Sequence, residues 1–362
     1  MGFAVTVMRK SIRHPSPWVY STASAVLVLA AAPGAQALNI IPIYGSSVTS
    51  LAQAATIESA FNTVAADFNK SFASPINVYI NVSWGSVAGQ SLPSNAVGAS
   101  STNLYGYYTY SQVLGALSRD SLANPSDTAL ATALKTMPTT APSGVLKYVV
   151  PSAEAKALGL ISGLQTSLDG SIGFAGNPSG YTFSLSGAVS PTAYDFSAVA
   201  AHEIEEVLGR ISGISSTATP PYRTVFDLFR YSSPGVLNDN YNGLAYFSVD
   251  GGKTNLSTFN NSSYGGDRSD WQTTTTTSGN IQDAFISKGE RMNLTAVDLT
   301  ALDVLGYGGV NLGDTSISKP GAVAFNLDSV PEPATWLTML LGLGLTGAAL
   351  RRRGSATVAV RG

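Results

Sequence analysis

Hydrophobic residues recur with two different periods in the first part of the chain. Across residues 76–84 apolar and polar residues alternate, as in a strand with one buried face. Across residues 54–72 the apolar residues recur every three to four positions, as on one side of a helix. The isoleucine-rich residues 38–44 predict a strand before this helix. The chain is therefore expected to open as strand, long helix and strand.

The middle and later parts of the chain predict shorter elements. Residues 86–110 are rich in Gly, Ser, Asn and Tyr, which predicts an extended surface loop. Residues 294–307 form an amphipathic pattern that predicts a helix ending at Gly306. The remaining expected elements are short helices at 111–120, 125–135 and 151–160, strands at 169–174 and 181–185, and a strand with a tight turn at 245–252.

One predicted helix, residues 195–210, carries the residues best suited to chemistry. Asp195 or Ser197 can cap its start, and Gly209 stands where a left-handed C-terminal cap would end it. His202 and Glu206 are four positions apart and so share a face, with Glu203 beside them. This face is the first place to look for a functional site.

The two ends of the chain differ from its middle. Near the start, basic residues precede a short apolar run and Ala35-Gln36-Ala37, a pattern typical of a secretory signal peptide over residues 1–37. The apolar run is too short to span a membrane, which argues against a membrane anchor here. At the other end, Val330-Pro331-Glu332-Pro333-Ala334 precedes a second apolar stretch and three consecutive arginines, 351–353.

These C-terminal features resemble the PEP-CTERM sorting tag of Gram-negative bacteria, which would occupy residues 330–362. The resemblance implies transient anchoring in the inner membrane and cleavage by an exosortase. It further implies release to the cell surface or to the extracellular polysaccharide matrix. A permanent membrane anchor is the alternative interpretation.

Removing both ends changes the charge of the chain. Seven of the 20 Lys and Arg residues and one of the 22 acidic residues lie in these ends, so the middle carries 13 basic and 21 acidic residues, about −8. An acidic protein of this kind is not expected to bind nucleic acid. The chain has no cysteine, which excludes disulfides and cysteine-bound metals. His202 is the only histidine between the two ends.

The order His202-Glu203-x-x-Glu206 resembles the His-Glu-x-x-His helix of zinc peptidases, with a glutamate in place of the second histidine. The resemblance implies that His202 and Glu206 bind zinc and that Glu203 acts as general base. A carboxylate oxygen binds zinc at roughly 2.0–2.2 Å, about the same distance as a histidine nitrogen, so the exchange is chemically possible. The added negative charge would make the metal a weaker Lewis acid.

The surrounding residues resemble metzincin peptidases of the matrixin-like kind. Residues 194–204 are similar to the approach to the active-site helix, and residues 169–174 to the edge strand that lies alongside an extended peptide substrate. Ser212 stands where the third histidine of the family would be, and no Met-turn can be placed.

This resemblance implies an α+β, zincin-like fold. It would have a twisted mixed sheet, an active-site helix and a helical C-terminal subdomain. The catalytic domain would span residues 38–307, and residues 308–329 would link it to the tag.

A third metal ligand must come from outside the helix, because catalytic zinc sites commonly use three protein ligands. Asp227, 21 positions after Glu206, is our first candidate, and a helix cap or a partner for Arg230 is the alternative role. Tyr231 is a candidate to assist an oxyanion, against a plain packing role. The turn at residues 265–271 holds two acids and is a possible calcium site or a simple structured loop.

Together these features predict an exported zinc-dependent peptidase that acts on a peptide or protein. The alternative is a non-catalytic surface or matrix protein that keeps a zincin-like fold. A glycoside hydrolase is a third class, but it needs two carboxylates that face each other across a cleft, and the sequence gives no way to pair them.

Overall fold

The computed structural model describes residues 38–308, apart from residues 93–95, 126, 143, 146, 216–221, 262–264 and 274–278. They lie in one compact unit. The signal peptide and the sorting tag expected from the sequence, and all but the first residue of the linker, lie outside the described residues. The described residues form a mixed α+β fold with several sheets and helices.

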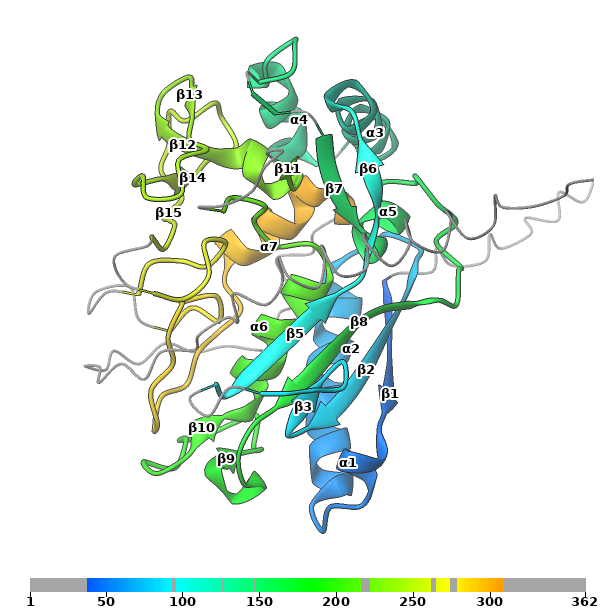
Figure 1. Cartoon of the computed structure of the whole chain (residues 1–362), viewed down its shortest axis with the longest axis vertical. Coiled ribbons are helices and arrows are strands. Elements are labelled where there is room, and N and C mark those ends of the chain that lie inside the picture. Colours follow the sequence, from blue (N-terminus) through cyan, green and yellow to red (C-terminus); the bar gives the residue numbers. More distant parts are fainter. Residues whose placement is uncertain are drawn as a thin grey trace, which may run out of the picture. The chain divides into compact units, whose positions relative to one another are not determined.

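The largest sheet has four strands in the order β1-β2-β8-β5 (Figure 1). Strands β1 (Asn39–Tyr44), β2 (Asn77–Trp84) and β8 (Leu168–Phe174) are parallel to one another. Strand β5 (Gly98–Thr102) is antiparallel to β8, with Ser100 opposite Ile172. The predicted opening of strand, helix and strand is confirmed, because α2 (Ala54–Ser71) connects β1 to β2.

Two expectations about this sheet are wrong. Residues 169–174 are not an edge strand, since β8 is hydrogen-bonded to β2 on one side and to β5 on the other. Residues 86–110 are not one surface loop, since they contain β5 and also β6 (Leu104–Tyr108). Gly98, Ser100 and Ser101 have low strand propensity, and pairing with β8 overrides it.

Helices α2 and α6 (Phe196–Val207) pack together, and in Figure 1 they lie behind the large sheet. Helix α6 also contacts β5 and β8. An aromatic cluster joins helix and sheet: Phe196 of α6 lies 4.6 Å from Phe174 of β8 between ring centroids. Phe196 also stacks on Trp84 of β2 at 6.5 Å. The packing of these buried aromatic rings fixes the start of α6 against the sheet.

Further helices and small sheets complete the described part of the chain. A three-stranded sheet has the order β11-β7-β6 and a four-stranded one the order β13-β12-β14-β15, while β3 pairs with β4 and β9 with β10. The remaining helices are α1 (Ser46–Thr49), α3 (Tyr110–Ala123), α4 (Thr128–Thr136), α5 (Ser152–Ala157) and α7 (Ala296–Leu302). The remaining strands are β3 (Ser86–Val87), β4 (Gln90–Ser91), β7 (Lys147–Pro151), β9 (Tyr181–Thr182), β10 (Tyr194–Asp195), β11 (Tyr222–Arg223), β12 (Arg230–Ser233), β13 (Val236–Leu237), β14 (Tyr246–Phe247) and β15 (Ser257–Thr258).

The part of the chain after α6 differs from the helical subdomain that the resemblance implies. Among its described residues, α7 is the one α-helix, and short strands and irregular segments make up most of the rest. Residues 232–290 are rich in Gly, Ser, Asn and Thr, which favour turns over helices. Helix α7 continues into a turn, Asp303–Tyr307, in which Gly306 has a φ of 98°. The Tyr307 hydroxyl donates to Leu208 O at 2.7 Å and ties this turn to the end of α6.

Candidate metal centre

Helix α6 begins at the cap and ends at the glycine that its sequence predicts. Asp195 caps its start, with a carboxylate that accepts from Ser197 N at 3.1 Å. Arg291 forms an ion pair of 3.1 Å with this buried carboxylate. At the other end Gly209 has a φ of 114°, which a residue with a side chain rarely adopts. The helix therefore presents His202, Glu203 and Glu206 from a fixed position.

Strand β5 lies unusually close to α6. A Cβ atom added at Gly98 would lie 2.5 Å from Val199 Cγ1 and 2.7 Å from Glu203 Oε1, so any other residue here would displace these side chains. Two residues further along the same face, Ser100 Oγ donates to Glu206 Oε2 at 2.7 Å. Side chains alternate between the two faces of β5, so Gly98 and Ser100 both face α6. Both residues help to position the carboxylates of the helix.

His202 has the orientation of a metal ligand. Its Nδ1 lies 2.8 Å from Ile281 O, and because a carbonyl oxygen only accepts, Nδ1 carries the proton. In the neutral imidazole, Nε2 then keeps its lone pair free to bind a metal. It faces Glu206 Oε1 and Asp270 Oδ1, each at 3.8 Å, which is too long for a hydrogen bond.

Glu206 and Asp270 each direct an unpartnered oxygen at the same place as His202. Glu206 Oε1 and Asp270 Oδ1 are buried and have no hydrogen-bond partner within the described part of the chain. One ligand atom from each of the three residues lies within 4.8 Å of the other two. Ligands about 2.1 Å from a tetrahedral ion are on the order of 3.4 Å apart, so a small shift would let all three bind one ion. The residues present therefore fit a divalent cation.

The electrostatics favour a cation here. Burial raises the pKa of Glu206 to about 7; the nearby His202 lowers it, while Asp267 and Asp270 raise it further. Burial, then the charge of Asp267, also raises the pKa of Asp270. Carboxylates that burial and mutual repulsion push toward the neutral form are stabilised as anions by a dication.

A buried arginine, Arg210, lies close to the carboxylate of Asp270. Arg210 is fully buried, stacks over the Trp271 ring at 4.2 Å, and donates to Gln282 Oε1. Its Nη1 is 3.9 Å from Asp270 Oδ1, and its Nε is 3.5 Å from Glu205 Oε2. Since Trp271 follows Asp270 directly, this stacking fixes the segment that carries the carboxylate.

Glu203 lies where the sequence places a general base. It is 2 % exposed, and its Oε2 accepts no hydrogen bond from an N–H or O–H donor among the residues described. Burial first, and then the charge of Glu206, raise its pKa well above the usual value. With His202 it lines a cavity of about 20 Å³, enough for about one water molecule.

Asp227 does not join this group. One of its oxygens accepts from Ser212 Oγ at 2.6 Å and the other from the backbone N–H groups of Gly213 and Thr224, both at 2.9 Å. Its carboxylate thus holds a loop together. The structure brings Asp270, not Asp227, beside His202 and Glu206.

The other residues singled out in the sequence have local roles. Tyr231 is buried in β12 and is not among the residues that line the cavity beside His202. Asp267 accepts from Ser269 N and Ser269 Oγ, both at 2.7 Å, as in a tight turn. The turn at 265–271 thus contributes an acid to the site, since its Asp270 faces His202 rather than a calcium site within the turn.

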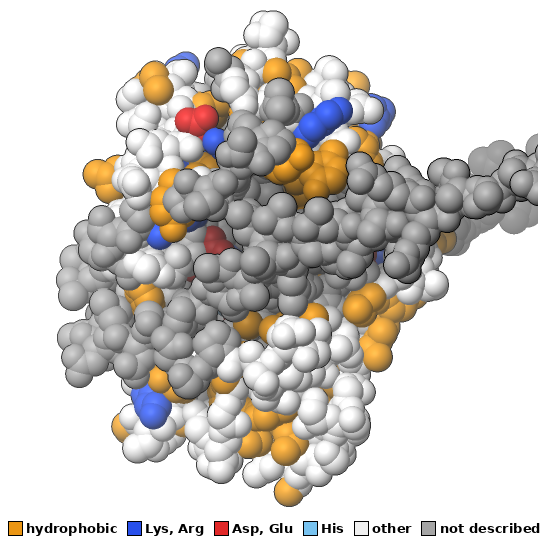
Figure 2. Space-filling model, viewed as in Figure 1, with side chains coloured by type: hydrophobic (Ala, Val, Ile, Leu, Met, Phe, Trp, Pro, Cys, Tyr) orange, Lys and Arg blue, Asp and Glu red, His pale blue; other side chains and the backbone are white. Residues whose placement is uncertain are grey.

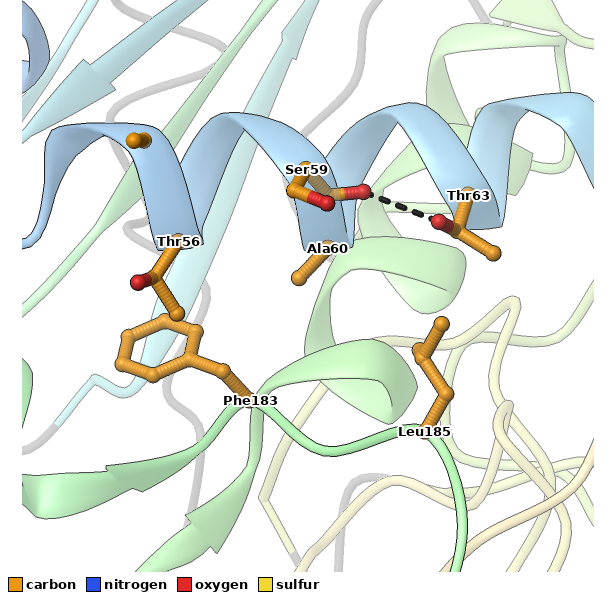
Figure 3. A pocket seen from close by; sticks show the side chains of 7 residues that line it. Thr56, Ser59, Ala60, Thr63, Phe183 and Leu185 are labelled. Atoms are coloured by element: carbon orange, nitrogen blue, oxygen red, sulfur yellow. Dashed lines mark hydrogen bonds between the residues drawn. The ribbon is translucent and has the colours of Figure 1, made fainter.

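A second hollow, of about 390 Å³, lies between α2 and the segment after β9 (Figure 3). Phe183 and Leu185 face Thr56 and Ala60 across it, and no titratable side chain lines it. On the face shown in Figure 2, charged side chains are scattered among uncharged ones, in keeping with 12 % charged residues. Neither feature brings together groups suited to chemistry.

Comparison with known proteins identifies the C-terminal tag. Residues 329–353 match the model of the PEP-CTERM protein-sorting motif. This match confirms the sorting motif that the sequence predicts and supports an exported protein that an exosortase recognises. No curated protein and no solved structure matches the chain. Within the described residues, no helix combines the length and apolar character needed to cross a membrane.

Proposed function

We propose that this chain is an exported metal-dependent peptidase. The observation that carries the proposal is the convergence of His202 Nε2 with two buried carboxylate oxygens that accept no hydrogen bond from the described residues, Glu206 Oε1 and Asp270 Oδ1, beside Glu203. Buried polar atoms are nearly always hydrogen-bonded, so two buried carboxylate oxygens that meet beside a histidine nitrogen without hydrogen bonds suggest a cation site. We propose Asp270 as the third ligand in place of Asp227.

The donor set defines the ion that fits. One imidazole and two carboxylates suit zinc or a neighbouring divalent transition metal better than calcium, which prefers six or more oxygens. Two carboxylates balance the charge of a divalent ion. When bound, such an ion makes a water molecule more acidic and polarises a carbonyl group.

The residues around the ligands have distinct roles in this proposal. Glu203 takes a proton from the attacking water as general base. Ile281 O holds His202 in the tautomer that leaves Nε2 free, and Ser100 holds Glu206. Because these partners are fixed before substrate arrives, the ligand atoms need little rearrangement to bind the ion.

The arrangement of α6 under a mixed sheet with an antiparallel outer strand supports a zincin-like fold. Among the described residues, β5 pairs with a strand on one edge only, the edge formed with β8. We propose that an extended peptide substrate adds to the other edge of β5, since a free strand edge offers backbone donors and acceptors. This replaces the role expected for residues 169–174.

The sorting motif gives the proposed enzyme a destination. Transient tethering in the inner membrane, release after cleavage by the exosortase, and contact with extracellular polysaccharide are part of the proposal. Cleavage of a protein substrate would then take place outside the inner membrane.

Metal analysis combined with one substitution tests the proposal. The purified full-length protein should contain about one zinc, or a comparable transition metal, per chain. Glu203→Gln should retain this metal and lose hydrolysis of denatured casein, because it removes only the base. A folded wild-type protein that binds no transition metal would instead support the non-catalytic surface protein.

A further inference from the structure

A segment of four residues, Asn280 to Asp283, is fixed alongside α6. Ile281 O accepts from His202 Nδ1, and Gln282 Nε2 donates to His202 O at 3.0 Å. The backbone of the segment is held as well, since Trp271 N donates to Gln282 O at 2.8 Å and Asp283 N to Asn280 O at 3.0 Å. The segment that orients His202 therefore also fixes the position of Asp283.

Asp283 is a buried acid with an unused oxygen. The residue is 4 % exposed, and its Oδ2 has no hydrogen-bond partner among the residues that the structure describes. Leaving a buried polar group unpaired costs about 1–3 kcal/mol. Asp283 is neither a proposed metal ligand nor the proposed general base, so those roles do not explain why its oxygen is left unpaired.

Asp283 lines the same small cavity as His202 and Glu203. The rest of the lining is apolar and comes from Val97, Ala198, Val199, Ile281, Ile286 and Met292. Burial in these surroundings, and next the charge of Asp298, raise the pKa of Asp283 to about 9. At neutral pH its carboxyl group therefore carries a proton that it can donate.

We propose that Asp283 is a second catalytic carboxyl group, the general acid that protonates the nitrogen of the leaving amine. This inference rests on the proposed peptidase function. A peptide nitrogen leaves poorly as an anion, so a positioned proton donor accelerates the cleavage. Glu203 and Asp283 have different roles in this proposal. Glu203 follows the ligand His202, so a bound dication would hold its carboxylate ionised and able to accept a proton, whereas Asp283 supplies one.

The protons balance over one cycle. The water oxygen forms a bond to the carbonyl carbon while Glu203 takes one water proton. The C–N bond then breaks while the Asp283 O–H proton passes to the nitrogen. Finally the proton on Glu203 returns to Asp283, directly or through a water molecule, so that both groups regain their starting states and one water has been added to the peptide bond.

Leaving-group dependence tests this role. The probes are a peptide that the wild-type protein cleaves in a casein digest and the 4-nitrophenyl ester of its acyl half, whose phenolate leaves without a proton. Asp283→Asn should lower kcat/KM on the peptide about 100-fold or more, the usual contribution of a general acid, and on the ester less than about tenfold. Equal losses on both substrates, or none on the peptide, would overturn the role.

Two further variants keep the test decisive. Asp303→Asn also replaces a buried acid, one that does not line this cavity, and should leave the ratio of peptide to ester activity unchanged. Asp283→Glu keeps a carboxyl group displaced by one methylene. It should give a ratio between those of the wild type and Asp283→Asn, and it replaces the latter if that variant does not fold. A wild-type ratio in Asp283→Glu and Asp283→Asn alike would contradict the proposal.

The outcome also separates this inference from the peptidase function. A metal-loaded wild-type protein that releases no peptide from denatured casein would refute the peptidase function and Asp283's role with it. A wild-type protein that cleaves both, with variants whose ratios do not change, would refute only the role of Asp283.

Discussion

Asp270→Asn is the substitution that most clearly separates the proposed ligand set from the one expected from sequence. It keeps the size of the side chain but removes one of the two negative charges that face His202 Nε2. Loss of an outer-shell partner already lowers metal affinity about 10- to 100-fold. A direct ligand should therefore cost at least about 100-fold, or about 2.7 kcal/mol.

This loss can be measured as a change in melting temperature. With free metal at about 1,000 times its Kd, the wild-type protein gains about 4.1 kcal/mol of stability, and the variant should gain about 1.4 kcal/mol. For a domain of this size, 1 kcal/mol shifts Tm by roughly 2–4 °C. Zinc should thus raise the wild-type Tm by about 8–16 °C and that of Asp270→Asn by about 3–6 °C in a thermal-shift titration.

Asp227→Asn is the matched control for this titration. It should lower the Tm of the metal-free protein, because its carboxylate holds Ser212 and Thr224. It should leave the shift caused by zinc unchanged. Asp270 is not a ligand if Asp270→Asn keeps the full zinc shift, and Asp227 takes part in binding if Asp227→Asn loses it.

Two other substitutions test the packing around the site and a remote acidic pair. Gly98→Ala places a Cβ 2.5 Å from Val199 Cγ1 and should cost about 1–3 kcal/mol in urea unfolding, whereas Gly115→Ala in α3, where a Cβ has room, should not destabilise. Burial, and then Asp127, raise the pKa of Asp303 to about 8 from 3.8, so the folded state binds an extra proton between these values. The free energy of unfolding should therefore fall as pH rises from 4 to 8. Asp303→Asn should flatten this fall, and an equally steep profile would count against the burial of this carboxyl group.

Helix α6 could be predicted from the sequence because the residues that define it are close together in the chain. Asp195 caps α6 and Gly209 ends it as expected, and the spacing of His202 and Glu206 fixes their common face. The opening elements β1, α2 and β2 were equally accessible, because their hydrophobic periods are long and regular.

Strand β5 and Asp270 could not be found in this way. Gly98 and Ser100 are required in β5 because α6 packs closely against them. This requirement comes from the tertiary structure, and from sequence alone the same small residues predict a loop. Asp270 reaches His202 because contacts distant in sequence hold its segment in place, among them the stacking of Arg210 on Trp271. Asp227 has the more plausible spacing, but the backbone N–H groups of its own loop occupy its carboxylate.

The most direct test of the central claim is an X-ray fluorescence scan of crystals of the purified protein, followed by anomalous diffraction at the absorption edge of the metal found. We predict one anomalous peak about 2.0–2.2 Å from His202 Nε2 and from a carboxylate oxygen of both Glu206 and Asp270. A structure in which these three side chains point apart, or in which no peak lies between them, would contradict the account.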